Sequence, residues 1–222
     1  MTSPLEAARR EVFETARRMQ DAGLVAGCAG NASARVADHP SMIAITPTSI
    51  PYDSMTADQI SLVDLSSGQQ IGNGPSPSSE LPTHLAIYRA RGDVRAIVHT
   101  HSPWVSVLSV LHRPLPPVID EMAVFFGREI PVAPYAFTGT EILGDNVVRA
   151  LGEWNAVILS NHGNFCTGST LSDALQVAIK MEATAEVFVN ALRLGEPVSL
   201  PDDAINLGAE MFRARQRAKK ES

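Results

Sequence analysis

Segments with the pattern of strands alternate with segments of helical pattern along this chain, and this alternation is the strongest limit on its fold. Apolar runs of strand length occupy residues 32–36, 42–46, 60–64, 94–100, 130–133 and 156–160. Apolar residues recur at helical spacing in residues 5–22, 80–91, 103–111, 140–151 and 171–193. Interleaved strands and helices predict an α/β or α+β domain around one central sheet.

The size of the chain fits one domain. With 222 residues, 45% of them hydrophobic, it can bury a full core without dividing into two. We therefore expect residues 1–222 to form a single domain. The last segment, 212–222, is basic and shows no apolar periodicity after Phe212, so we expect it to be a mobile tail.

Charge and hydropathy exclude several classes of partner. The chain has 18 Lys and Arg against 24 Asp and Glu, a net charge of −6, and no basic block that could follow a nucleic-acid backbone. Residues 1–6 lack the pattern of a signal segment, and no apolar stretch approaches the roughly 18 residues that span a bilayer. The 2 cysteines are too few for a disulfide framework. We expect a cytoplasmic protein that binds neither nucleic acid nor membrane.

Three histidines lie at the ends of predicted strands. His99 and His101 close the apolar run 94–98, and His162 follows the run 156–160. Side chains two residues apart leave a strand on the same face with α-carbons about 7 Å apart, a span over which both imidazoles can reach one metal ion. Three neutral histidines leave a tetrahedral zinc with one open position for water or substrate, as in catalytic sites. Among the carboxylates, the motifs favour Glu80 as the one beside such a metal, where it could act as a displaceable ligand or as a general base.

Other interpretations of these residues stay open at the sequence level. Strand histidines are often hydrogen-bonded core residues rather than metal ligands. His84 lies four residues after Glu80 and could share its helix face, so a Glu80/His84 ligand pair is an alternative.

Small polar residues gather with glycines in three segments, 27–31, 46–49 and 78–79. Backbone N–H groups, hydroxyls and an amide in such turns can enclose a phosphate without arginine. Ordinary turn chemistry uses the same residue types, so each segment alone also fits a plain turn.

Five short motifs stand in the order and approximate spacing of the class II aldolase/adducin family, and the chain resembles that family from about residue 5 to about residue 205. The motifs are Gly30-Asn31, Ile45-Thr46-Pro47-Thr48, Pro77-Ser78-Ser79-Glu80, His99-Thr100-His101-Ser102 and Asn161-His162-Gly163. The resemblance implies a central, mainly antiparallel sheet with helices on both faces.

The resemblance also assigns roles by position. It implies that His99, His101 and His162 bind Zn²⁺, with Mn²⁺ or Co²⁺ as other possible metals, and that Glu80 ligates the resting metal and shuttles a proton. It further implies a pocket for the phosphate of the substrate, formed by Asn31, Thr48, Ser49, Ser78 and Ser79.

The activity implied by the resemblance is that of a zinc-dependent lyase. Such an enzyme cleaves a ketose 1-phosphate to dihydroxyacetone phosphate and an aldehyde through an enediolate that the metal stabilises. The family acts without a Schiff-base lysine, in agreement with Lys180 as the only lysine before the tail. The resemblance implies a homotetramer with a small phosphorylated sugar as substrate.

The chain departs from the family pattern at three positions. Ser49 replaces a glycine in the phosphate turn. On the side of the aldehyde, Glu121 stands where a tyrosine handles the aldehyde, and Arg215 lies near the position of a tail tyrosine. Phe125 and Phe126 could make that pocket more apolar. An L-fuculose 1-phosphate-like sugar and a deoxy or methylthio pentulose 1-phosphate are therefore both candidate substrates.

Other activities remain as alternatives. Relatives on the same scaffold carry out decarboxylation, epimerisation or dehydration of sugar phosphates through metal-stabilised enolates. A non-catalytic module of the adducin type is the alternative from another class, although such a module has no need of a complete metal shell.

Overall fold

The computed structural model describes the backbone of residues 3–221 and the side chains of residues 3–218. Its centre is one eight-stranded sheet in the order β4-β3-β2-β1-β5-β8-β7-β6. The strands are β1 Asn31–Val36, β2 His39–Ile45, β3 Ser61–Asp64, β4 Gln70–Ile71, β5 Ala96–Thr100, β6 Val132–Ala133, β7 Ala156–Leu159 and β8 Asn164–Gly168. All neighbours pair antiparallel except β6 and β7, which run parallel.

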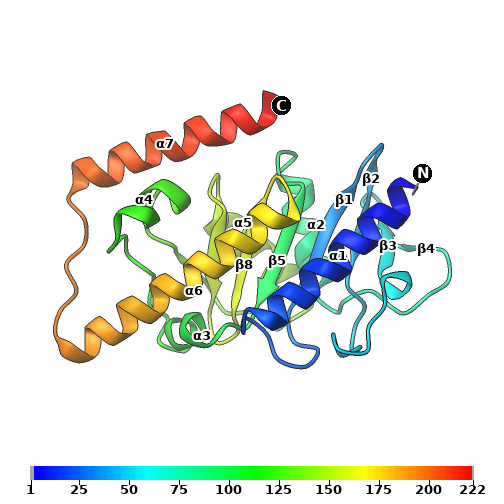
Figure 1. Ribbon diagram of the computed structural model, residues 1–222, viewed down its shortest axis with the longest axis horizontal. Helices are drawn as coiled ribbons and strands as arrows, with labels where there is room; N and C mark the ends of the chain where they lie inside the picture. The colour runs from blue at the N-terminus through cyan, green and yellow to red at the C-terminus, as the bar shows by residue number, and fades with distance from the viewer. Residues whose placement is uncertain (1–2, 222) are drawn as a thin grey trace.

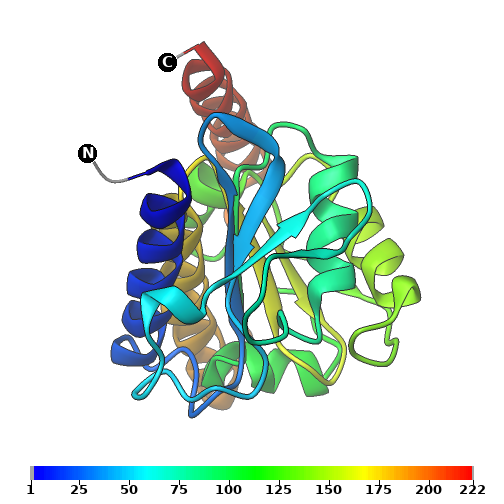
Figure 2. The ribbon, with the colours of Figure 1, turned by 90° about the vertical axis from the view of Figure 1, so that its right-hand side faces the viewer.

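Helices cover both faces of this sheet (Figures 1 and 2). On one face lie α1 Pro4–Asp21 and α6 Leu171–Leu194, and on the other α2 Leu81–Ala90 and α5 Glu141–Leu151. The short helix α3 Pro103–Val110 packs on α6, while α4 Asp120–Phe126 packs on α7 Asp202–Glu221, and a 3-10 turn spans Ala57–Gln59. The predicted α/β fold, with a mainly antiparallel sheet between helices, is confirmed.

Alternation along the central strands divides the core in two. In β5, Ala96 and Val98 pack toward α1 and α6, whereas Ile97 packs toward α2 and α5. In β8, Cys166 faces the first layer and Phe165 the second. A strand with both faces covered buries every side chain, which is why β5 and β7 consist largely of apolar residues. By the same alternation His99 lies on the face of α2.

Two strands and two helices were not predicted from the sequence. β8 lacks a clear strand pattern because Asn164, Thr167 and Gly168 flank only two apolar residues, but β5 and β7 satisfy its backbone on both sides. The two-residue β4 is too short to give a pattern, and α4 was not predicted either. The segment 212–222, expected to be a mobile tail, is helical as far as Glu221 as the end of α7, and Ser222 lies outside the described residues. Its mobility stays a prediction.

Phe212 explains how the C-terminal helix is attached. This residue is 2% exposed and lies against Trp154, with ring centroids 5.2 Å apart. Arg213 on the same helix pairs with Glu153 at 2.9 Å. No helix within the described residues is long and apolar enough to cross a membrane.

Candidate metal centre

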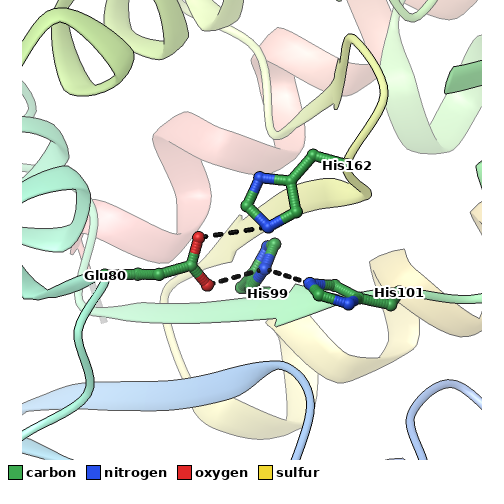
Figure 3. A group of neighbouring side chains, drawn as sticks. All are labelled: Glu80, His99, His101 and His162. Carbon is green, nitrogen blue, oxygen red and sulfur yellow. Dashed lines mark hydrogen bonds and ion pairs between the residues drawn. The ribbon is translucent and has the colours of Figure 1, made fainter. Parts of the chain in front are cut away.

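The three histidines and Glu80 come together at one point of the structure (Figure 3). Each offers a ligand atom, and these four atoms lie within 4.8 Å of one another. His99 belongs to β5 and His101 follows its end, His162 occupies the turn between β7 and β8, and Glu80 precedes the first residue of α2. The convergence expected from the strand ends is therefore present.

Hydrogen bonds at the start of α3 fix the segment that carries His101. After His101 the chain enters α3, whose first N–H groups need acceptors. The carboxylate of Glu182 on α6 accepts from Trp104 N at 2.8 Å and from Val105 N at 3.0 Å. A carboxylate at a helix N-terminus also interacts favourably with the helix dipole. The turn that carries His101 is thereby tied to the long helix on the opposite face of the sheet.

The His162 turn is packed closely against β5. The backbone N–H of His162 donates to Ser109 Oγ at 2.8 Å, and Asn161 adopts a left-handed conformation with φ of 55°. A Cβ atom on Gly163 would lie 2.2 Å from the carbonyl oxygen of Thr100. Only glycine allows the turn to approach the end of β5 this closely, which brings His162 to the other two histidines.

The ring nitrogens face one another across a small space. His99 Nε2 lies 2.9 Å from His101 Nε2 and 2.8 Å from Glu80 Oε2, and His162 Nε2 lies 3.3 Å from Glu80 Oε1. His99 Nδ1 lies 2.9 Å from the carbonyl oxygen of Asn164. Since a carbonyl only accepts, Nδ1 carries a proton, and Nε2 is the nitrogen that can bind a metal. A backbone carbonyl behind a histidine is the usual orienting partner of a metal ligand, so the donor set fits a divalent cation.

Electrostatics keeps two of these rings neutral. Burial lowers the pKa of His101 to about 3, with His99 and His162 adding repulsion. Burial and the neighbouring His99 lower the pKa of His162 to about 4. Both imidazoles are therefore unprotonated at neutral pH, the state that binds a metal.

Glu80 is ionised for a different reason. Burial alone would raise its pKa, but the attraction of His99 and His162 and a hydrogen bond from Asn31 outweigh burial and hold the pKa well below its usual range. Asn31 Nδ2 donates to Oε2 at 2.8 Å, and Thr138 Oγ1 donates to Oε1 at 3.0 Å. Both oxygens of this carboxylate therefore have fixed directions.

Thr138 was not among the residues predicted from the sequence. It lies 58 residues from Glu80, in the loop between β6 and α5, and hydroxyl residues are common in loops. The neighbouring Gly139 offers an indirect signal, because a Cβ there would lie 2.7 Å from Ser79 O, so this loop must press against the Glu80 segment.

His84 is not part of the metal cluster. It is fully buried, its Nδ1 lies 2.7 Å from Ser33 Oγ, and its Nε2 lies 2.5 Å from Asn31 Oδ1. Both ring nitrogens already have partners on β1, so the alternative Glu80/His84 ligand pair is wrong.

The segments expected to hold phosphate also lie together. Thr48 N donates to Ser76 O at 2.9 Å and Ser78 N to Thr46 O at 3.0 Å, which joins the second segment to the third. The hydroxyl of Thr46 accepts from the backbone of Ala32, directly after Asn31. Asn31 and Ser78 are buried, Thr48 is half-buried, and Ser49 and Ser79 are exposed. Ser49 is in the left-handed region, with φ of 58°.

The two departures on the side of the aldehyde, Glu121 and Arg215, lie around Phe125. Glu121 on α4 pairs with Lys180 on α6, and the ammonium of Lys180 lies 4.3 Å from the centre of the Phe125 ring. The guanidinium of Arg215 on α7 lies 4.7 Å from the same ring centre. The partner of Glu121 within the chain is thus a lysine, and its part in recognising the aldehyde stays a prediction.

The chain matches known proteins over most of its length. The sequence model described as the class II aldolase and adducin N-terminal domain matches residues 10–189. An L-fuculose phosphate aldolase of Escherichia coli O6:H1 is 36% identical over 205 residues, 92% of this chain and 93% of the relative. A 5-methylthioribulose-1-phosphate/5-deoxyribulose-1-phosphate aldolase of Rhodospirillum rubrum is 35% identical over 208 residues, 93% of this chain and 91% of the relative.

A solved structure supports the same assignment. The structure titled L-fuculose 1-phosphate aldolase superposes with a TM-score of 0.88 at 32% sequence identity and covers 93% of this chain and 96% of that chain. The resemblance inferred from five short motifs is confirmed. By sequence and by structure, the chain belongs to the class II aldolase and adducin family.

Proposed function

We propose that this protein is a metal-dependent aldolase that cleaves a ketose 1-phosphate to dihydroxyacetone phosphate and an aldehyde. The observation that carries the proposal is the convergence of three imidazoles and one oriented carboxylate within 4.8 Å. The candidate substrates are L-fuculose 1-phosphate-like sugars and 5-deoxy or 5-methylthio pentulose 1-phosphates, the classes named for the relatives at 36% and 35% identity.

We assign His99, His101, His162 and Glu80 as the residues that would hold the metal, with Zn²⁺ as the first choice and Mn²⁺ or Co²⁺ as alternatives. Imidazole nitrogen with a carboxylate suits all three ions, and zinc is the ion most often bound by three histidines with an open position. Bound there, the ion would polarise the carbonyl of the substrate and stabilise the negative charge left on the three-carbon fragment.

Glu80 is the proposed catalytic residue. When the carbon–carbon bond breaks, its electron pair stays with the three-carbon fragment, and the hydroxyl of the other half loses its proton as it becomes the aldehyde. Glu80 is ionised, so it can take up a proton and deliver it to the carbon of the three-carbon fragment. Asn31 and Thr138 each bind one oxygen of Glu80 and so keep the carboxylate from rotating.

We assign the phosphate pocket to Asn31, Thr48, Ser49, Ser78 and Ser79. Their segments lie together and offer hydroxyls, an amide and backbone N–H groups, which can bind a phosphate through neutral donors. The left-handed Ser49 supports this role, because such turns aim successive N–H groups toward an anion.

The test is cleavage of a panel of ketose 1-phosphates by metal-loaded enzyme, coupled to a reductase for dihydroxyacetone phosphate. We expect product from at least one sugar, and none after removal of the metal. Two results without any dihydroxyacetone phosphate would contradict the aldolase. Release of carbon dioxide from an oxo-acid phosphate would indicate a decarboxylase, and an epimerised or dehydrated sugar would indicate an epimerase or a dehydratase. A protein that binds no divalent metal and is inactive would favour the adducin-type module.

We also propose that the protein forms a homotetramer in the cytoplasm and takes a small phosphorylated sugar as its partner. Large apolar side chains that are exposed in the single chain support assembly; they include Val110, Leu111, Val187, Leu194 and Val198. Light scattering of the purified protein measures the mass directly, and a mass near the 23.8 kDa of one chain would contradict the tetramer.

A further inference from the structure

A continuous chain of hydrogen bonds runs between β1 and α2 behind the carboxylate of Glu80. Tyr88 Oη lies 2.9 Å from Ser33 Oγ, which lies 2.7 Å from His84 Nδ1. His84 Nε2 lies 2.5 Å from Asn31 Oδ1, and Asn31 Nδ2 lies 2.8 Å from Glu80 Oε2. None of these five residues is more than 5% exposed. We call them the buried hydrogen-bond chain.

The spacing of the residues explains why the chain is continuous. Asn31 and Ser33 are two apart on β1 and leave the strand on the same face. Glu80, directly before α2, and His84 and Tyr88 on α2 are four apart, so their side chains lie on one side of the helix. Two side chains of the strand therefore alternate with three of the helix. A substitution at any one of these positions would leave a buried polar atom unpaired.

Chemistry fixes the direction of each bond. The carboxylate of Glu80 only accepts, so the amide of Asn31 must present Nδ2 to it and Oδ1 to His84. His84 Nε2 must then carry a proton and donate it. Burial lowers the pKa of His84 to about 3, so the ring is neutral and its Nδ1 accepts from Ser33 Oγ. Ser33 Oγ in turn accepts from Tyr88. All four donors point toward Glu80.

We propose that His84 is a positioning residue that acts through Asn31. Its Nε2–H group locks the amide of Asn31, and the locked amide holds Oε2 of Glu80 in the direction needed to exchange a proton with the substrate. The inference rests on the proposed function, since it gives Glu80 that proton-transfer role. Without the donor at Nε2, the oxygen side of the Asn31 amide loses its partner, so the direction of the Nδ2 hydrogen bond to Oε2 is less sharply fixed.

Two substitutions separate this role from a structural one. Glutamine can place an amide N–H near the position of His84 Nε2, whereas asparagine reaches only the position of Nδ1. We therefore expect H84N to lower kcat by about tenfold or more and to change KM by less than about threefold. A decrease of about tenfold corresponds to the loss of one buried hydrogen bond that supports a charged group, here the carboxylate of Glu80. H84Q should keep kcat within about threefold of wild type. Equal losses in both variants, or wild-type kcat in H84N, would overturn the proposal.

A second variant covers the case in which H84N does not fold. Y88F removes only the hydroxyl at the far end of the buried hydrogen-bond chain, and we expect kcat to fall by roughly twofold to fivefold as the polarisation of the chain weakens. An unchanged kcat in folded Y88F would count against the proposal.

A spectroscopic measurement does not depend on activity. In zinc-loaded wild type, a long-range ¹H–¹⁵N spectrum should show His84 as the neutral Nε2–H tautomer, and a charged ring or the Nδ1–H tautomer would overturn the direction of the chain. If wild type with this tautomer cleaves no ketose 1-phosphate, the proposed function fails while the hydrogen-bond chain stands. If wild type cleaves a ketose 1-phosphate but H84N and H84Q have the same kcat, only the positioning role of His84 fails.

Discussion

Glu80→Gln removes the charge of the proposed proton carrier and keeps the shape of its side chain. Both oxygens of Glu80 have assigned partners, Asn31 Nδ2 at 2.8 Å and Thr138 Oγ1 at 3.0 Å. A glutamine can present its oxygen to Asn31 and its amino group to the hydroxyl of Thr138, which can accept as well as donate. The number of hydrogen bonds is therefore conserved, and we expect the variant to fold with the three histidines in place.

The loss in turnover follows from the missing proton. A glutamine can neither take up nor deliver a proton, and a positioned acid or base contributes about 10²- to 10⁴-fold in rate, so kcat should fall by about that factor. Steady-state cleavage of the best ketose 1-phosphate measures kcat, and thermal unfolding and bound metal serve as controls. A folded, metal-loaded Glu80→Gln variant with kcat within about threefold of wild type would refute the role of Glu80 as proton carrier.

Two further predictions concern the histidine turn and the effect of pH. Gly163→Ala should force β5 and the His162 turn apart, because the new Cβ would lie 2.2 Å from Thr100 O. We expect a lower metal content and a loss of about 1–3 kcal/mol in the free energy of unfolding, which denaturant titration measures. Gly92→Ala, where a Cβ meets nothing within 4 Å, is the matched control, and equal effects of the two changes would contradict the reasoning. The metal-free protein should lose stability as the pH falls from about 6.5 toward 3. Burial lowers the pKa of His84 and of His101 to about 3 in the folded protein, whereas in the unfolded chain both histidines take up protons near the ordinary histidine pKa. Protons therefore bind the unfolded chain first and favour unfolding. Thermal unfolding at about pH 7.5 and about pH 5.5 checks this sign, and a Tm that is equal or higher at the lower pH would contradict it.

Much of the fold and of the metal site could be predicted from local sequence patterns. A buried strand is an apolar run, and the polar residues at its end mark where the chain leaves the sheet, so His99, His101 and His162 were visible without coordinates. Their common position depends on strand order: His162 lies in the turn from β7 into β8, and β8 pairs with β5, whose end carries His99 and His101.

Other parts depend on contacts between distant segments. β8 contains Asn164 and Thr167, polar residues that are buried only because neighbouring strands and side chains satisfy them. Thr138 and Glu80 meet across 58 residues, and no spacing rule links a loop hydroxyl to a helix start. The buried hydrogen-bond chain combines a strand period with a helix period, and neither pattern alone shows that the two faces meet.

The central claim is that His99, His101 and His162 hold one divalent ion together. Metal analysis of purified wild type and of three single His→Ala variants tests it most directly, with circular dichroism to show that each variant is folded. We expect wild type to bind one ion per chain and each folded variant to lose most of it, because removal of one ligand leaves an incomplete site. Folded variants that all retain the metal content of wild type would contradict the account.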